Sequence, residues 1–376
     1  MPSSTPLPVA EAALLPDVRA DLDRSGWLAG ALMQLAPVWL CRLAYDLSAA
    51  LDPPPPGAPP LAEMDLSLPG AAGGGAPLAA RLYAPRQLGE RRGPLLLYVH
   101  GGGFMIGSLA SHAPTCRALA AALGWRVLAV TYRRAPEARY PAAPLDVLAA
   151  YAHVLAHRAD FGLEEAAPRV VVAGDSAGGQ LTLELGLRVR DANRAAAAGA
   201  SSSLSSSPLP STLIPPVLLV PIYPVINSFV AWPSRARFAA GFGALTEPLL
   251  RRFLDAYLGT EPEALAAHSR DAYLCPDLQA DLSGLPPIVL LTAQYDMLCD
   301  EGVAFVATAR ARGAAVEHVH AEGRLHACLQ HLASMPSNRA LLESLAAVVK
   351  ARVEGGRAGT VLPSQRRRRG SRPGAS

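Results

Sequence analysis

The sequence predicts an α/β fold in which helices flank a mainly parallel central sheet. Short β-branched and apolar runs alternate with longer segments that have the apolar spacing of helices, which is typical of parallel sheets. One such run, 170–173, leads directly into the glycine-rich sequence G-D-S-A-G-G and then into a helical pattern. A second glycine-rich segment, 100–104, follows another apolar run in the same way. With 376 residues, 51% of them hydrophobic, the chain can bury the large core that this fold needs.

The predicted elements follow one another between residues 61 and 354, the predicted main domain. The expected strands are short apolar runs at 64–68, 79–83, 95–99, 126–132, 170–173, 217–222, 288–292 and 315–320. The expected helices have apolar residues three or four positions apart, at 113–123, 145–156, 180–191, 249–258, 303–312 and 340–353. In the helix at 180–191, for example, Leu181, Leu185 and Val189 share one face. The segment 229–276 is predicted to leave the sheet and to help roof a pocket.

Three segments lie outside this alternation. Residues 1–60 are predicted to hold one or two apolar helices and a stiff proline-rich linker at 52–60. The uncharged stretch 26–41 is shorter than the ~20 residues of a membrane span, so packing on the body is favoured over membrane contact. The Ala- and Ser-rich run 192–210 is predicted to be a disordered surface insertion, and 355–376 a disordered basic tail.

Charge and cysteine content exclude several classes of function. Five arginines among the last eleven residues exceed the whole net charge of +3, so the body is near neutral and no nucleic-acid partner is expected. The five cysteines show no C-x-x-C spacing, which predicts reduced thiols in an intracellular compartment and no metal site. The N-terminus lacks the pattern of a signal or transit peptide, so a cytoplasmic location is expected, and no cofactor is implied.

The sequence G-D-S-A-G fits the G-x-S-x-G pattern of a nucleophilic serine. Strand, tight turn and helix in this order place Ser176 at the turn, with its hydroxyl outside the sheet. A Cβ atom at Gly174 or Gly178 would collide with neighbouring backbone in so sharp a turn. The helix that follows directs free N–H groups towards the serine. In a chain with 32 glycines the pattern alone would be weak, because a glycine-rich loop can simply link a strand to a helix.

A nucleophilic serine needs a base, and the base needs a carboxylate to orient it. His326 lies in the loop after a predicted strand, whereas His318 and His320 alternate within that strand; His331 is the fallback. Asp296 follows the strand 288–292 across a short loop. Asp300 and Glu301 begin the next helix, where Asp300 is explained as an N-cap.

Several motifs together resemble the hormone-sensitive-lipase-like carboxylesterases, over roughly residues 60–350. They are H-G-G-G-F at 100–104, Y-R-R-A-P-E at 132–137, G-D-S-A-G-G at 174–179, D-M-L-C-D-E-G at 296–302 and G-R-L-H at 323–326. The resemblance implies an α/β-hydrolase fold with an N-terminal helical cap, here residues 12–51. It also implies that Ser176 is the nucleophile, His326 the base and Asp296 its orienting carboxylate, with an oxyanion hole formed by Gly101, Gly102 and Ala177.

The resemblance predicts a serine carboxylesterase acting on small uncharged esters of short to medium acyl length, without a metal or cofactor. Two departures concern the surroundings of the site: Ala327 and Cys328 stand where the family usually has Gly-Phe, and the insertion at 192–210 is extra. The gibberellin receptors resemble these esterases but lack the catalytic histidine, so the presence of His326 favours the enzyme. A membrane-attached lipase or deacetylase, anchored by residues 27–40, is the other alternative.

Overall fold

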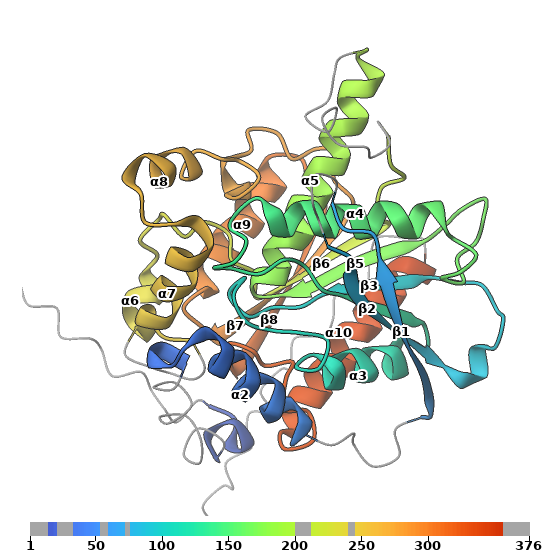
Figure 1. Ribbon diagram of the computed structural model, residues 1–376, viewed down its shortest axis with the longest axis horizontal. Coiled ribbons are helices and arrows are strands. Elements are labelled where there is room, and N and C mark those ends of the chain that lie inside the picture. Colours follow the sequence, from blue (N-terminus) through green and yellow to red (C-terminus); the bar gives the residue numbers. More distant parts are fainter. Residues whose placement is uncertain are drawn as a thin grey trace, which may run out of the picture.

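A twisted sheet forms the centre of the computed structural model, and helices cover both of its faces (Figure 1). The structure describes residues 14–20, 33–52, 59–71, 76–199, 212–239 and 245–355. Most of the predicted linker, most of the insertion, the basic tail and part of the 26–41 stretch lie outside these ranges.

Within the described residues, eight strands form one sheet in the order β1-β2-β4-β3-β5-β6-β7-β8. They are β1 (Leu61–Leu68), β2 (Leu78–Pro85), β3 (Leu95–Val99), β4 (Arg126–Val130), β5 (Val170–Asp175), β6 (Leu218–Ile222), β7 (Ile288–Tyr295) and β8 (Val316–Leu325). The pairs β1–β2 and β2–β4 are antiparallel, and the remaining pairs are parallel. The carboxyl ends of β5, β7 and β8 therefore meet at one edge of the sheet, which is where a ligand site is expected in such folds.

Two helical layers bury the faces of the sheet. The helices are α2 (Val38–Ala50), α3 (Ala113–Leu123), α4 (Ala142–Ala156), α5 (Ala177–Ala197), α6 (Pro233–Phe238), α7 (Glu247–Leu258), α8 (Pro262–His268), α9 (Cys299–Ala311) and α10 (Pro336–Glu354). Apolar residues of α4, α5 and α9 share one core with the sheet, and those of α3 and α10 share the core on the opposite face. The α/β class predicted from the alternating pattern is confirmed.

A third apolar cluster joins the N-terminal segment to the body near the carboxyl edge. It includes Cys41 of α2, Phe238 of α6, and Leu249 and Phe253 of α7. In Figure 1, α2 lies beside this group of helices. The Arg42 side chain donates hydrogen bonds to the carbonyl oxygens of Met105 and Ala135, each at 2.9 Å, which ties α2 to the loops after β3 and β4.

Several boundaries differ from the sequence prediction. Helix α5 continues to Ala197, so the first residues of the predicted insertion are helical; a run of alanines, the strongest helix formers, explains this. Strands β7 and β8 extend to Tyr295 and Leu325, which places Asp296 and His326 immediately after them, without the expected loops. The predicted N-cap role of Asp300 is wrong, because α9 begins at Cys299. Among the described residues, no helix combines the length and apolar character needed to cross a membrane.

Candidate active site

Ser176 occupies the sharp turn between β5 and α5. Its backbone has φ 55° and ψ −117°, and its N–H donates to the carbonyl oxygen of Ile222 at 2.8 Å. A Cβ atom on Gly174 would lie 2.6 Å from the carbonyl oxygen of Val99, and one on Gly178 would lie 2.7 Å from that of His100. Glycine on both sides therefore lets the turn approach β3 closely enough to expose the serine at the sheet edge.

A continuous line of hydrogen bonds joins Ser176 to His326 and Asp296. His326 Nε2 lies 2.9 Å from Ser176 Oγ, and His326 Nδ1 lies 2.7 Å from Asp296 Oδ2. The Asp296 side chain is fully buried, and its other oxygen accepts the N–H of Leu298 at 2.9 Å. The structure thus brings together the three side chains that the sequence singled out, and each comes from the carboxyl end of a different strand.

The carboxylate changes the proton affinity of the imidazole. Burial lowers the pKa of His326, but the charge of Asp296 and the hydrogen bond to it raise the pKa by more, so the net pKa lies above its ordinary value of 6.5. A hydrogen bond from Nδ1–H to the carboxylate leaves Nε2 as the acceptor that faces the serine hydroxyl. This is the arrangement in which histidine can remove the serine proton.

The other candidate histidines lie elsewhere. His318 and His320 both contact Thr292 Oγ1, at 2.8 and 2.9 Å, as side chains of the β7–β8 pair. The carbonyl oxygen of His331 accepts the N–H of Met335 in the turn before α10. It is His326 and not His331 that contacts Ser176.

The glycine-rich loop after β3 carries the donors predicted for the oxyanion hole. The N–H of Gly101 donates to Asp175 Oδ1 at 2.9 Å, so this donor is already engaged in the described structure. In the described part of the chain, the N–H groups of Gly102, Gly103 and Ala177 have no acceptor. Ala177 begins α5, where the helix dipole is positive, and Gly102 and Gly103 follow Gly101, whose N–H contacts Asp175 next to the serine.

Backbone geometry explains why the loop needs glycine. Gly102 and Gly103 have φ values of 109° and 58°. A Cβ atom on Gly102 would lie 2.5 Å from the carbonyl oxygen of Ile106, and one on Gly103 would overlap the ring of Phe253. Larger residues would therefore push the loop out of place.

Asp175 is a buried carboxylate that the sequence analysis did not single out. It accepts hydrogen bonds from Tyr98 Oη at 2.8 Å and from the Gly101 N–H, and His112 Nε2 lies 3.3 Å away. Burial raises the pKa of Asp175, but His112 and these hydrogen bonds lower it by more, so its net pKa is below its ordinary value. Asp175 thereby links the serine turn to the glycine loop. In the sequence, the feature that could have indicated Asp175 is an acidic residue at the end of an otherwise apolar strand.

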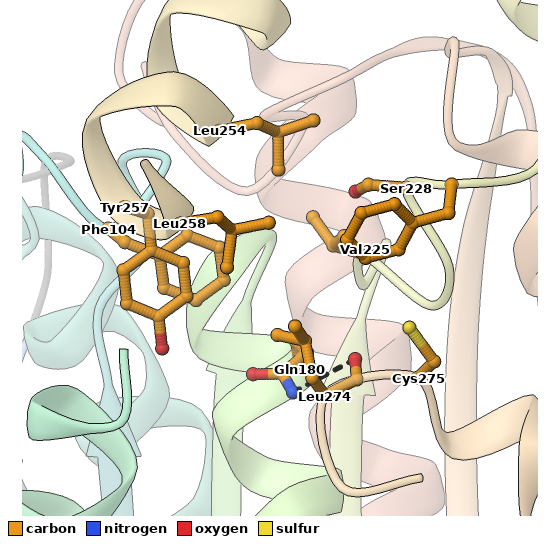
Figure 2. A pocket seen from close by; sticks show the side chains of 10 residues that line it. Phe104, Gln180, Val225, Ser228, Leu254, Tyr257, Leu258, Leu274 and Cys275 are labelled. Atoms are coloured by element: carbon orange, nitrogen blue, oxygen red, sulfur yellow. Dashed lines mark hydrogen bonds between the residues drawn. The ribbon is translucent and has the colours of Figure 1, made fainter. Parts of the chain in front are cut away.

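A small pocket lies between α5, α7 and the loops after β3 and β6, and Figure 2 shows its lining side chains. Its lining residues are Phe104, Gln180, Val225, Ser228, Phe229, Leu254, Tyr257, Leu258, Leu274 and Cys275. The predicted excursion 229–276 supplies several of them, including those of α7. Within the described ranges, no group of three or more His, Cys, Asp or Glu side chains could hold a metal ion.

Comparison with known proteins assigns the family. The family with the α/β-hydrolase fold matches residues 96–330. The chain is 31% identical over 287 residues to the esterase LipI of Mycobacterium tuberculosis, covering 76% of this chain and 80% of that protein. It is 36% identical over 255 residues to the carboxylic ester hydrolase LipN of the same organism, covering 67% of this chain and 60% of that protein. The chain belongs to the hormone-sensitive-lipase-like carboxylesterases.

Solved structures agree with this assignment. A hyperthermophilic esterase from Pyrobaculum calidifontis is similar with a TM-score of 0.72 at 30% identity, covering 90% of this chain and 98% of that chain. An ester hydrolase from the metagenome of Lake Arreo has a TM-score of 0.71 at 30% identity and the same coverage. The protein is therefore a carboxylic ester hydrolase with the α/β-hydrolase fold.

The two residues after His326 depart from the usual sequence of these carboxylesterases, and the structure shows the consequence. Ala327 has φ 63°, a conformation that favours glycine and costs a residue with a Cβ atom roughly 1 kcal/mol. Cys328 is buried and packs in the core shared by the sheet, α3 and α10. The substitution therefore changes core packing behind the histidine, and Cys328 does not line the pocket.

Proposed function

We propose that this carboxylesterase hydrolyses uncharged esters of short to medium acyl length, with Ser176 as the nucleophile. The observation that carries the proposal is the hydrogen-bonded line from Asp296 through His326 to Ser176. The receptor alternative requires a site without a working base. The contact between His326 and Ser176 favours the enzyme.

The proposed reaction has two halves. Ser176 Oγ attacks the ester carbonyl carbon while His326 Nε2 takes the hydroxyl proton, and Asp296 stabilises the imidazolium that forms. The tetrahedral intermediate collapses, the alcohol leaves with the proton from His326, and the acyl group remains on Ser176. Water then attacks this acyl-enzyme with the same assistance from His326, releasing the acid and restoring the serine.

The oxyanion of both tetrahedral intermediates would be held by backbone donors. We assign this role to the N–H groups of Gly102, Gly103 and Ala177, in place of Gly101, because these donors are free in the described chain. One such donor contributes roughly 3–4 kcal/mol to lowering the barrier.

The variant Gly102→Ala tests this assignment. Its methyl group would press on the backbone of Ile106 and move the neighbouring donors. We expect kcat on p-nitrophenyl butyrate to fall about 100-fold with a smaller change in KM, since the lost interaction forms only with the oxyanion. Circular dichroism and thermal unfolding check that the fold survives. An unchanged kcat in a folded variant would show that Gly102 does not position a donor.

Substrate range follows from the walls of the pocket and from the N-terminal segment. The lining is mainly apolar, which suits an uncharged chain. Residue Met105, which follows the pocket residue Phe104, accepts a hydrogen bond from Arg42 of α2. We therefore propose that residues 12–51 act as a cap over the acyl pocket.

The proposed function is tested with a graded series of p-nitrophenyl esters, from acetate to long-chain acids. We expect the highest kcat/KM with short or medium acyl chains, because the space between the lining side chains is small. Inactivity across the whole series, with a folded protein, would contradict the proposal and favour small-molecule binding.

One observation favours membrane association as a second candidate property. Along residues 35–51, five large apolar side chains spaced four residues apart are between 47% and 86% exposed: Leu35, Trp39, Leu43, Leu47 and Leu51. Such a stripe can lie in a lipid interface without crossing it. Recovery of the protein in the membrane fraction of lysed cells would favour a membrane-associated lipase over the cytoplasmic enzyme that we propose.

A further inference from the structure

Two neighbouring side chains of α2 make hydrogen bonds to the loops that carry the proposed catalytic groups. Asp46 Oδ1 accepts the hydroxyl of Ser108 at 2.6 Å, and Tyr45 Oη accepts from Gln330 Nε2 at 2.5 Å. Ser108 lies in the loop after β3, which also holds the proposed oxyanion donors. Gln330 lies in the loop between β8 and α10, which begins with His326. Helix α2 therefore contacts both loops with polar groups.

Both contacts continue to one buried imidazole, that of His112. On the first path, Gln330 Nε2 lies 3.3 Å from His112 Nε2. On the second path, the N–H groups of Ser108 and Ser111 each donate to the hydroxyl oxygen of the other serine, at 2.8 and 3.1 Å. Ser111 Oγ then lies 2.9 Å from His112 Nδ1. Two chains of hydrogen bonds thus run from α2 to the two nitrogens of the same ring.

His112 lies at the junction between the glycine-rich loop and the serine turn. Its Nε2 is 3.3 Å from Asp175 Oδ1 and 3.3 Å from the backbone nitrogen of Gly101. Asp175 directly precedes Ser176 and accepts the N–H of Gly101. The side chains of His112 and Asp175 are both buried, so their positions depend on protein partners and not on bulk water. Whatever holds the imidazole therefore also holds this junction.

Tyr45 makes two separable contributions to the first chain. Its ring packs edge-on against the ring of His112, with centroids 5.9 Å apart and planes at 69°. Its hydroxyl contacts Gln330. Burial and the charge of Asp175 raise the pKa of Tyr45, so the hydroxyl keeps its proton. Phenylalanine at this position would keep the ring contact and remove only the hydrogen bond.

We propose that α2 does more than cover the acyl pocket: it holds the glycine-rich loop and the serine turn in the geometry that the reaction needs. The positioning residues are Tyr45, Asp46, Ser108, Ser111, Gln330 and His112. If either chain is broken, the imidazole and the buried carboxylate beside it lose a fixed partner, and the oxyanion donors next to them shift. Helix α2 thereby contributes to kcat. This inference rests on the proposed esterase function and adds positioning residues to it.

The variant Tyr45→Phe tests the first chain. We expect kcat on p-nitrophenyl butyrate to fall about fivefold with little change in KM, because one positioning hydrogen bond is lost and no group that touches the substrate changes. The loss should be equal for acetate, butyrate and longer esters, since the oxyanion donors act on every ester alike. A helix that only lined the acyl pocket would give a loss that varies with chain length.

The matched control is Tyr151→Phe in α4. It removes another tyrosine hydroxyl that makes one hydrogen bond, to the carbonyl oxygen of Ile214 at 2.7 Å, in the core formed with α4 and α5. This variant should keep the wild-type kcat for every ester. Thermal unfolding of each variant, with kcat measured well below the transition, separates lost stability from lost turnover.

Further variants test the second chain and the link through Gln330. Asp46→Ala removes the acceptor of the Ser108 hydroxyl and should lower kcat about fivefold, whereas Asp46→Asn keeps an acceptor there and should restore most of the activity. Gln330→Met should lower kcat at least as much as Tyr45→Phe does. Adding Tyr45→Phe to Gln330→Met should cost nothing more, because the hydroxyl has then already lost its partner.

The outcomes separate this inference from the function on which it rests. A loss in Tyr45→Phe that is equal for all esters, absent from Tyr151→Phe and absent in the Gln330→Met background supports the positioning role. The inference is overturned, and the esterase proposal stands, if folded Tyr45→Phe keeps the wild-type kcat or if its loss varies with chain length. An Asp46→Asn variant no better than Asp46→Ala also overturns it. Inactivity of the wild type on every ester would overturn the proposed function itself.

Discussion

Ser176→Ala should reduce the hydrolysis of p-nitrophenyl butyrate by about 10⁶-fold in kcat, to the level left by binding and the oxyanion donors alone. The substitution removes the oxygen that lies 2.9 Å from His326 Nε2 and leaves no other nucleophile in its place. A backbone φ of 55° is unfavourable to a similar extent for alanine and for serine, so the turn should keep its shape in the variant.

The measurement is steady-state turnover together with thermal unfolding. A folded variant, with an unfolding temperature close to that of the wild type, shows that the loss is chemical. Adding His326→Ala to Ser176→Ala should cost little more, since the three side chains act as a unit. Turnover near the wild-type level in Ser176→Ala would remove the serine from the mechanism.

Asp296→Asn should lower kcat about 10⁴-fold while preserving the fold. Asparagine can still accept the N–H of Leu298, but it cannot stabilise the imidazolium or hold the Nδ1–H form of His326. Asp300→Asn is the matched control, because it removes the rival carboxylate in the first turn of α9. We expect that variant to keep most of its activity. A large loss in Asp300→Asn and a small one in Asp296→Asn would reverse the assignment.

The pH dependence of kcat/KM provides a second test of the role of Asp296, by comparing the wild type with Asp296→Asn. His326 must be neutral to accept the serine proton, so activity falls as pH drops through the His326 pKa. Because that pKa is raised by Asp296, the midpoint of the acidic limb of kcat/KM should lie above pH 6.5 in the wild type. Loss of the carboxylate charge should move it to lower pH. An acidic limb at the same pH in both proteins would mean that another group controls it.

The features that could be predicted from the sequence are those that local pattern determines. Alternating apolar runs indicated the sheet, and the turn at Ser176 followed from its flanking glycines. Asp296 and His326 could be chosen because the carboxyl ends of parallel strands meet at one edge. Their hydrogen bonds to one another depend on the register of β7 and β8, which the sequence does not show.

The features that were missed depend on contacts between distant segments. The N–H of Gly101 donates to Asp175, a residue 74 positions away in the sequence. Three identical glycines in the sequence therefore do not show which of their N–H groups remain available to a substrate. Gln180 and Tyr257 come from α5 and α7 and face one pocket only in the folded chain. Asp300 resembled an N-cap, but α9 begins at Cys299, so Asp300 lies in the first turn of the helix.

Covalent labelling tests the central claim most directly. A p-nitrophenyl alkylphosphonate reacts with an activated serine and stops at a stable analogue of the tetrahedral intermediate. Intact-mass and peptide analysis should find one phosphonyl group per chain, on Ser176, with activity lost in proportion to labelling and no label on Ser176→Ala. Complete inactivation with the label on another residue, or full activity after Ser176 is labelled, would contradict the account.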